Sequence, residues 1–548
     1  MKQHREVGTL REYRDTISAD YAAQPALRNL SEVGVTYGKL GERSRAVEAE
    51  LDRRGIRRGD RVVLLAENRP EWGMWYLGVT ARGAVIVPIL TDFHERQIAG
   101  IIEHCEPELI VVSTQMSQAV TETKVEQIRI DEVWELPEAL GTDRPDQAPA
   151  PDDLAALLYT SGTTGTPKGV MLSHKNLMSN VEAGLDVFPI VSEDRLLSIL
   201  PLAHTYECTV GFLTPLRAGA SITYLGGPPT ISRLLPAFEE VHPTIMLSVP
   251  LILEKVYQAK VAPIFAKVPA WIGGFAPVRK LIHRIAVGKL SKQFGGNIRF
   301  FGLGGAPISP ATERFLFEGG FPYAVGYGLT ETAPLLAGAD VAHQRLRSTG
   351  PAVKGVELRL QPVEGGSAGK ETSREGEVQA RGGNIMLGYY RNPEATTEAF
   401  TEDGWFKTGD LGSFGKDGYL FIRGRLKSMI LGPSGENIYP EEIEAEINAE
   451  PIVEESLVLQ VGGNLVARVR LNAEAVAKQV GAMAGKIDVE TFRAQANELL
   501  ERLRKDINAR MNRFSKLAKV VLQEEEFERT PTRKIKRFLY QQQDRTAT

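Results

Sequence analysis

Short apolar runs alternate with longer helix-like stretches through about the first 430 residues of the chain. The runs Arg61–Ala66 (RVVLLA), Ala84–Ile89 (AVIVPI) and Leu109–Ser113 (LIVVS) are continuous rather than alternating. Such runs are typical of strands that are buried on both faces of a sheet. Tyr37–Arg53 has helical spacing instead. This pattern predicts βαβ units, and therefore an α/β fold with mainly parallel sheets covered on both faces.

The chain changes character near Gly424–Gly435. Pro440 is followed by two glutamates, which predicts a helix start, because proline needs no hydrogen-bond partner there and acids favour the positive end of the helix dipole. Short strands are expected at Ser456–Val461 and Val466–Leu471, followed by a long charged helix. The predicted domains are residues 1–426 and 427–548.

Composition and charge exclude several classes of protein. The 548 residues include 65 Lys plus Arg and 69 Asp plus Glu, a net charge of −4, so no nucleic-acid partner is expected. The two cysteines, Cys105 and Cys208, cannot form a disulfide scaffold or a Cys-rich zinc site, which favours a reducing compartment. Residues 1–21 lack the apolar core of a secretory signal, and no apolar run approaches the roughly 20 residues of a spanning helix. We expect a cytoplasmic protein, either soluble or peripheral at the inner face of the membrane.

The segment Tyr159–Gly169 (YTSGTTGTPKG) is the most informative of the chain. It lies between two apolar runs, which predicts a loop between two strands. Its glycines allow a tight turn with exposed N–H groups, and its hydroxyls and lysine add donors and charge, as a polyphosphate requires. Lys168 is followed by glycine, so this is not a Walker A loop; a flexible linker is the alternative. The candidate phosphate-binding residues are Thr160, Ser161, Gly162, Thr163, Thr164, Gly165 and Lys168.

Five further motifs follow in order and span nearly the whole chain. They are LPLAHTYE (Leu200–Glu207), YGLTET (Tyr327–Thr332), WFKTGDLG (Trp405–Gly412), GRLKSMILGPSGENIYPEEIE (Gly424–Glu444) and TPTRKI (Thr530–Ile535). Together they resemble the acyl-adenylate-forming enzymes, which include acyl-CoA synthetases, firefly luciferase and peptide-synthetase adenylation domains. The resemblance implies a large N-terminal domain of layered sheets and helices with a small, mobile α+β C-terminal lid. It also implies that ATP and a carboxylic acid give acyl-AMP, from which a thiol then takes the acyl group.

The resemblance implies roles for residues near the nucleotide. Glu331 matches the family's Mg²⁺ ligand, a carboxylate suited to a hard dication, and Thr160 would supply a second contact. Thr330 would donate to the phosphate, and Tyr327 would lie against the adenine, although a core aromatic is the alternative. The turn that lines the adenine and acyl sites corresponds to Gly304 and Gly305, with Gly326 beside the substrate.

Further roles are carried over from the same family. Asp410 matches the acid that binds both ribose hydroxyls, although an Asp after Gly409 could instead cap a turn. Arg425 would assist at the ribose, and Lys427 falls at the hinge between the domains. His204 is assigned to the acyl or thiol channel, with a structural histidine as the alternative.

Lys534 is the residue assigned to catalysis of adenylation. An ammonium group placed where negative charge accumulates lowers the barrier to attack on the α-phosphate, with Lys168 and Glu331 assisting at the phosphates. The alternative is a solvated basic tail, because four other basic residues lie close by. The sequence departs from the family at Arg533, where glycine is usual, and at Leu431, where luciferase-like members carry a lysine.

Two segments bear on the acid and on its source. Val249–Tyr257 (VPLILEKVY) resembles a pattern of long-chain acyl-CoA synthetases, so the expected reaction is ligation of a long-chain fatty acid to CoA with ATP and Mg²⁺. Residues 260–292 contain seven Lys or Arg and no acid, with aromatic residues interspersed. This suits contact with an anionic membrane or, equally, a basic helix packed on the body. An acyl carrier protein as acceptor, a nucleotide-binding scaffold and a phosphotransferase that releases ADP are the alternatives.

Overall fold

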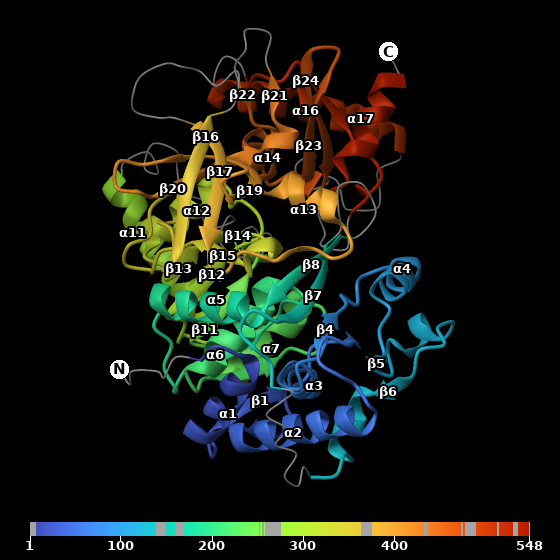
Figure 1. Ribbon diagram of the computed structural model, residues 1–548. Coiled ribbons are helices and arrows are strands. Elements are labelled where there is room, and N and C mark those ends of the chain that lie inside the picture. Colours follow the sequence, from blue (N-terminus) through green and yellow to red (C-terminus); the bar gives the residue numbers. More distant parts are fainter. Residues whose placement is uncertain are drawn as a thin grey trace.

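The computed structural model describes residues 7–138, 148–160, 168–250, 252–254, 257, 276–362, 375–431, 437–472, 475–476, 489–511, 515–529 and 535–546. Two seven-stranded sheets form the body of the molecule, and the C-terminal elements gather at one end of it (Figure 1). The α/β fold class is confirmed, because most strands of the two large sheets are parallel and are joined through helices.

The first large sheet, called sheet A, has the order β13-β12-β11-β9-β10-β1-β2. Its pairs are parallel except β1 with β2. Residues on one face pack with helices α11 (Ala276–Gln293) and α12 (Pro310–Gly319), and residues on the other face join the main core. The strands are β1 Pro25–Asn29, β2 Val35–Thr36, β9 Arg195–Ser198, β10 Ser221–Tyr224, β11 Ile245–Ser248, β12 Phe300–Leu303 and β13 Tyr323–Val325.

The second large sheet, called sheet B, has the order β18-β8-β7-β4-β3-β5-β6. In β3, Val62 and Leu64 pack into one core cluster, while Val63 and Leu65 pack into another. Burial of both faces explains why the predicted strands read as continuous apolar runs. The strands are β3 Arg61–Leu65, β4 Val85–Pro88, β5 Leu109–Val112, β6 Gln127–Arg129, β7 Leu154–Thr160, β8 Lys168–Ser173 and β18 Gly388–Tyr389.

Helices cover both sheets. Helix α2, Tyr37–Arg53, has the predicted bounds, and the Thr36 hydroxyl caps it by accepting from the Lys39 amide at 3.2 Å. The other helices of the body are α1 Leu10–Asp20, α3 Pro70–Ala81, α4 Glu95–Cys105, α5 His174–Val187, α6 Thr214–Arg217, α7 Ile231–Val241, α11 Ala276–Gln293, α12 Pro310–Gly319 and α13 Pro393–Ala399. Shorter turns are η1 Ser117–Val120, η2 Ile130–Trp134, η5 Thr330–Thr332, η6 Leu426–Ser428 and the π-helix η4 Tyr206–Leu213.

An antiparallel four-stranded sheet lies between the body and the C-terminal elements, and the sequence pattern did not predict it. Its order is β16-β17-β19-β20, with β16 Val356–Pro362, β17 Glu375–Gly382, β19 Phe406–Phe414 and β20 Leu420–Arg425. Its own core is small and consists of Ala337, Val378 and Leu420. The sequences of its strands are therefore mostly polar, with few apolar positions. The register places Asp410 of β19 opposite Arg425 of β20. A two-stranded pair, β14 Tyr327–Gly328 and β15 Leu335–Ala337, lies nearby in the fold.

The C-terminal elements have a core of their own. Residues of α14, the three-stranded sheet β23-β24-β25 and α16 form one hydrophobic cluster. The contacts of this unit with the antiparallel sheet include the Tyr439 hydroxyl, which donates to Glu375 at 2.7 Å, and the pair Arg423–Glu442 at 3.8 Å. Its elements are β21 Ile430–Leu431, β22 Asn437–Ile438, α14 Pro440–Asn448, β23 Val453–Val461, β24 Asn464–Leu471, α16 Val489–Arg510, β25 Lys519–Leu522 and α17 Arg537–Thr546.

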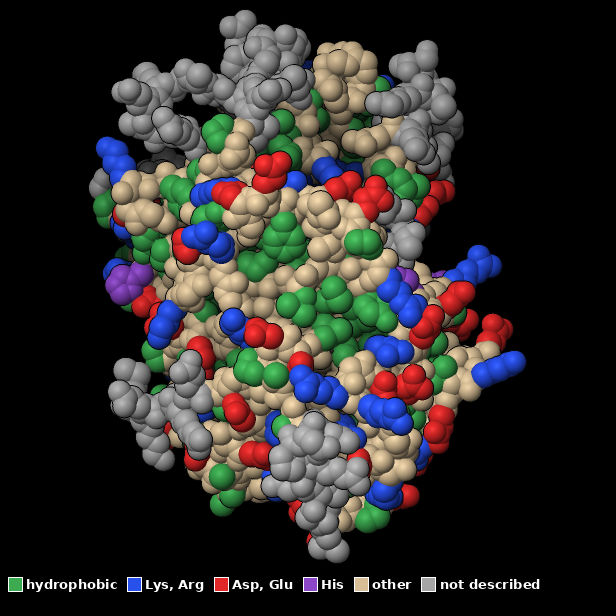
Figure 2. Space-filling view, in the orientation of Figure 1, with side chains coloured by type: hydrophobic (Ala, Val, Ile, Leu, Met, Phe, Trp, Pro, Cys, Tyr) green, Lys and Arg blue, Asp and Glu red, His purple; other side chains and the backbone are tan. Residues whose placement is uncertain are grey.

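The molecular surface carries both signs of charge. Figure 2 shows basic and acidic side chains interspersed over the described part of one face. Residues 260–275 of the predicted basic segment lie outside the described residues, and the remainder lies in α11. The outward side of α11 exposes Leu281 and Ile285 beside Lys280 and Arg284. Among the described helices, none has a stretch both long and apolar enough to span a membrane.

Candidate active site

The predicted phosphate loop connects two antiparallel strands, as expected. Thr160 ends β7 and Lys168 begins β8, and the two residues are paired across the ladder. The two ends of the loop therefore lie next to each other, on neighbouring strands of sheet B. The predicted loop residues Ser161, Gly162, Thr163, Thr164 and Gly165 lie outside the described residues.

Glu331 and Lys168 meet at the same aromatic ring. The Tyr389 hydroxyl donates to Glu331 Oε1 at 2.9 Å, and Lys168 Nζ lies 5.0 Å from the centre of the Tyr389 ring. The pairing of β18 with β8 brings Tyr389 opposite Val170, and the Met386 amide donates to the Glu331 carbonyl at 2.9 Å. Burial and the nearby carboxylate raise the pKa of the Tyr389 phenol, which keeps it a donor. This cluster thus holds one carboxylate and one ammonium group beside the ends of the loop.

Asp410 lies at the centre of a second polar cluster. Its Oδ2 accepts from the Tyr327 hydroxyl at 2.7 Å, and its Oδ1 pairs with Arg425 Nε at 2.8 Å. The Asp410 side chain is 7% exposed, whereas that of Arg425 is 46% exposed. Burial and the Asp410 carboxylate raise the pKa of the Tyr327 phenol well above its ordinary value, so its hydroxyl donates. The three predicted nucleotide residues therefore form a single hydrogen-bonded group.

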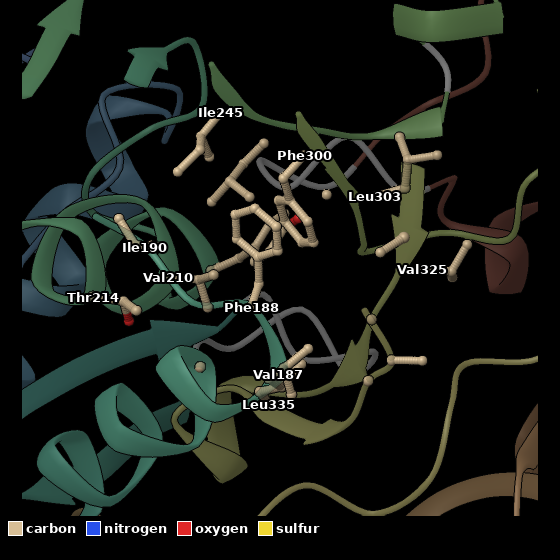
Figure 3. Close-up of a pocket in the computed structure, with 18 residues that line it drawn as sticks. Val187, Phe188, Ile190, Val210, Thr214, Ile245, Phe300, Leu303, Val325 and Leu335 are labelled. Carbon is tan, nitrogen blue, oxygen red and sulfur yellow. The ribbon is translucent and has the colours of Figure 1, made fainter. Parts of the chain in front are cut away.

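An apolar pocket lies between sheet A, α5 and η4 (Figure 3). The space between its walls, together with the open solvent at its mouth, is about 560 Å³. Predicted Gly326 lines it, and a side chain at Gly304 would meet the Tyr206 ring at 3.3 Å. Gly305 has φ +80°, a conformation that favours glycine. The lining residues are Gly184, Val187, Phe188, Ile190, Tyr206, Val210, Thr214, Ile245, Leu247, Phe300, Gly302, Leu303, Ala324, Val325, Gly326, Leu335, Gly338 and Ala339.

The structure describes three of the remaining predicted residues, His204, Thr330 and Lys427. His204 is not among the pocket-lining residues; it lies just before η4, where its Nδ1 accepts from the Tyr206 amide at 3.3 Å. Thr330 begins η5, directly before Glu331. Lys427 is exposed in η6, between β20 and the C-terminal unit. Lys534 lies outside the described residues.

Three of the described basic residues near Lys534 are paired with acids. Arg529 pairs with Glu455, Arg537 with Glu444, and Lys536 Nζ lies 3.4 Å from Glu528. The flanks of the TPTRKI motif are thus fixed to the C-terminal unit, which a freely solvated tail would not be.

Glu207 is a functional candidate that the sequence motif contained but did not explain. It is 1% exposed in η4, where its Oε1 accepts from the Ser198 hydroxyl at 2.5 Å. Its Oε2 has no hydrogen-bond partner among the described residues, and a side chain at Gly211 would lie 2.7 Å from that atom. Burial raises the pKa of the Glu207 carboxyl to about 8, so the group is mostly neutral at pH 7. The hydrogen bond between Glu207 and Ser198 connects η4, which carries the pocket residue Tyr206, to β9.

Glu207→Gln should remove a pH dependence of stability. In the unfolded chain a glutamate loses its proton near its ordinary pKa, whereas the buried Glu207 keeps its proton up to about pH 8. Wild-type stability should therefore fall with rising pH across this interval, relative to the variant, by about 1.4 kcal/mol per pH unit. Thermal unfolding from pH 5 to 9 measures the difference. The exposed Glu239→Gln on α7 is the control, and an equal slope for both variants would contradict the assignment.

Sequence reasoning missed Tyr389 and the aromatic residues of the pocket. Tyr389 follows a glycine at a strand end, a pattern too common to indicate a role. Phe188 and Phe300 are more than 100 residues apart in sequence and look like ordinary core residues. Only the fold shows that they face each other, with ring centres 4.1 Å apart.

Comparisons with known proteins agree with this geometry. Residues 16–390 match the model of the AMP-binding enzyme family. Long-chain-fatty-acid–CoA ligase FadD15 of Mycobacterium bovis is 30% identical, covering 92% of this chain and 90% of its own. Feruloyl-CoA synthase of an Amycolatopsis species is 30% identical over 78% of this chain and 80% of its own.

A solved structure extends the similarity to the whole fold. ATP-bound MatB from Rhodopseudomonas palustris is 27% identical and superposes with a TM-score of 0.76, covering 98% of this chain and 99% of its own. The order of motifs, the polar clusters beside the loop and the family match lead to one conclusion. This chain belongs to the AMP-binding enzyme family.

Proposed function

We propose that this protein is a fatty acid–CoA ligase that forms AMP. The acid and ATP give acyl-AMP and pyrophosphate, and the CoA thiol then displaces AMP to give the thioester. The observation that carries this proposal is the junction of an apolar pocket with a polar cluster. Gly326 lines the pocket, and the next residue, Tyr327, bonds to Asp410. An acyl chain in the pocket would therefore end beside a bound nucleotide.

The clusters suggest how the nucleotide is held. The Asp410 carboxylate, oriented by Tyr327 and Arg425, suits the two vicinal hydroxyls of a ribose, because a carboxylate accepts two hydrogen bonds at once. Lys168 at the end of the Gly/Thr loop, together with Thr330 directly before Glu331, would serve the phosphates. The Tyr327 ring would flank the adenine.

Mg²⁺ fits the donor set near the loop. Among the described residues there is no group of three or more His, Cys, Asp or Glu that could hold a metal ion by themselves. Mg²⁺ is commonly held by one or two carboxylates together with substrate phosphates, and the Glu331 carboxylate with the Thr160 hydroxyl matches that need. When bound, the ion would neutralise phosphate charge. The chain's own part is to fix Glu331, which Tyr389 does through its hydrogen bond.

The first chemical step involves the lid. A carboxylate oxygen of the acid attacks the α-phosphorus, and the bond to pyrophosphate breaks. Lys534 would stabilise the charge that develops on these oxygens. We place the domain boundary between residues 426 and 427, with Lys427 at the hinge. The described polar contacts Tyr439–Glu375 and Arg423–Glu442 suit an interface that can open.

A long-chain fatty acid is the proposed acid. The pocket walls are mostly aliphatic and aromatic, and none of the described residues that line it is charged. In the described part of the VPLILEKVY segment, Glu254 Oε1 accepts from the Ser309 amide at 2.8 Å, and Tyr257 packs on Phe315 of α12. One relative is named for long-chain fatty acids and another for ferulate, so these are the two classes of acid to compare as substrates.

Location and membrane contact stay predictions. Both cysteines are buried free thiols, which agrees with a reducing cytoplasm. Exposed Leu281 and Ile285 beside basic residues on α11 support a peripheral contact with anionic lipid.

One assay tests the proposed function. The protein is given ATP, Mg²⁺, CoA and either a saturated fatty acid from a graded series or ferulate, and the nucleotide product is separated by chromatography. We expect AMP with acyl-CoA, and the highest kcat/KM for a long-chain acid. A phosphopantetheine-bearing acyl carrier protein replaces CoA in a parallel arm. ADP as product, or no acid-dependent AMP, would overturn the proposal.

A further inference from the structure

The apolar pocket has a near end and a far end. Strands β11, β12 and β13 run parallel, with Ile245 opposite Phe300 and Gly302 opposite Ala324. Their carboxyl ends lead to Gly304 and Tyr327, on the nucleotide side. Their amino ends therefore mark the far end, and Phe300 lies about 10 Å from Leu303 along β12.

Two aromatic rings meet at the far end. Phe188, directly after α5, stacks on Phe300 with ring centres 4.1 Å apart and planes 25° apart. In Figure 3 the two rings lie face to face, between Ile190 and Ile245 on one side and Leu303 on the other. The rings thus lie between two parts of the pocket wall: the part with Leu303, toward the nucleotide side, and the part with Ile190 and Ile245.

A polar brace holds this pair in place. The Arg299 guanidinium lies 4.4 Å from the centre of the Phe188 ring and donates to the Pro189 carbonyl at 2.9 Å. It also donates to Asp194, which is 3% exposed and accepts from the Thr244 hydroxyl at 2.7 Å. The Arg299 side chain is 37% exposed, so the brace joins the surface of the protein to the buried Asp194 carboxylate. The Phe188 ring thus contacts a cation that is itself held by a carbonyl and by a buried carboxylate, so it does not move aside at low cost.

We propose that the stacked pair Phe188–Phe300 is the stop that sets the longest acyl chain the pocket accepts. This inference rests on the proposed function. A chain that reaches the pair can extend only by separating the rings, with loss of their contact and of the contact with Arg299. Removal of either ring joins the two parts of the pocket and gives the chain access to the wall formed by Ile190 and Ile245.

The test compares chain-length profiles. Acyl-CoA formation is measured for wild type, Phe188→Ala, Phe300→Ala and Phe188→Trp with saturated acids from octanoate to behenate. We expect both alanine variants to raise kcat/KM for acids longer than the wild-type optimum, relative to that optimum, by about tenfold or more. Phe188→Trp should shift the optimum to shorter acids, because a larger ring fills more of the pocket.

A matched control separates this role from general core damage. Phe294 is a buried aromatic residue on the opposite face of sheet A, and Phe294→Ala removes an equal volume there. It should leave the optimum unchanged. Phe188→Leu provides a milder variant should an alanine variant fail to fold. An active wild type with unchanged profiles in all the pocket variants would overturn this inference alone, whereas a wild type inactive with every fatty acid would overturn the proposed function.

Discussion

Lys534→Ala should abolish acid-dependent exchange between ATP and pyrophosphate, while supplied acyl-AMP is still converted to acyl-CoA. In the first step, negative charge develops on the attacking carboxylate and on the phosphate oxygens together, and an ammonium group stabilises both. Loss of one such preorganised group commonly lowers the rate by about 10²–10³-fold. The second step needs no stabilisation at the α-phosphorus, because its bond to pyrophosphate is already broken. Measurement of the two half-reactions separately shows the split.

The neighbouring Lys536 provides the control for this prediction. Its ammonium lies 3.4 Å from Glu528 and its side chain is 35% exposed, so Lys536→Ala removes an equal charge from the same segment. Exposed pairs of this kind contribute little to stability. We expect both half-reactions of Lys536→Ala to stay within a few-fold of wild type. Equal loss of both half-reactions in Lys534→Ala would contradict the catalytic assignment and favour a structural role.

Asp410→Ala should weaken the use of ATP about a hundredfold or more, measured as kcat/KM for ATP. A carboxylate that accepts from two ribose hydroxyls makes two charge-assisted hydrogen bonds, each worth about 1.5–3 kcal/mol. The substitution also takes an acceptor away from Tyr327 and an ionic partner from Arg425. Asp410→Asn keeps the shape but not the charge, so it should give an intermediate loss. A calorimetric titration with AMP alone measures the contribution of the ribose contact to binding, without turnover.

An exposed aspartate in the adjoining loop distinguishes ribose binding from general damage to the sheet. Asp403 is 58% exposed and pairs with Arg359 at 2.5 Å. Asp403→Ala should leave the KM for ATP unchanged. Unfolding temperatures of both variants, measured with and without AMP, test whether Asp410→Ala loses stabilisation by the ligand specifically. Unaltered AMP affinity in Asp410→Ala would refute the ribose assignment.

Local patterns predicted the elements that depend on neighbouring residues. The spacing in Tyr37–Arg53 gave the bounds of α2, and the apolar runs gave β3, β4 and β5 within a residue or two. The loop between β7 and β8 was predicted because glycine and hydroxyl residues interrupt two strand-like runs. The antiparallel sheet was missed, because only a small core supports it and its strands carry many polar residues.

The sequence by itself determined the order of the motifs, the family and most of the candidate site residues, since these are properties of short segments. Only the tertiary structure decided which of them meet. Tyr389 reaches Glu331 across 58 residues, and Tyr327 reaches Asp410 across 83. The pairing of Phe188 with Phe300 likewise depends on where α5 ends relative to β12. Such contacts follow from strand register and helix packing over the whole chain, which no local periodicity encodes.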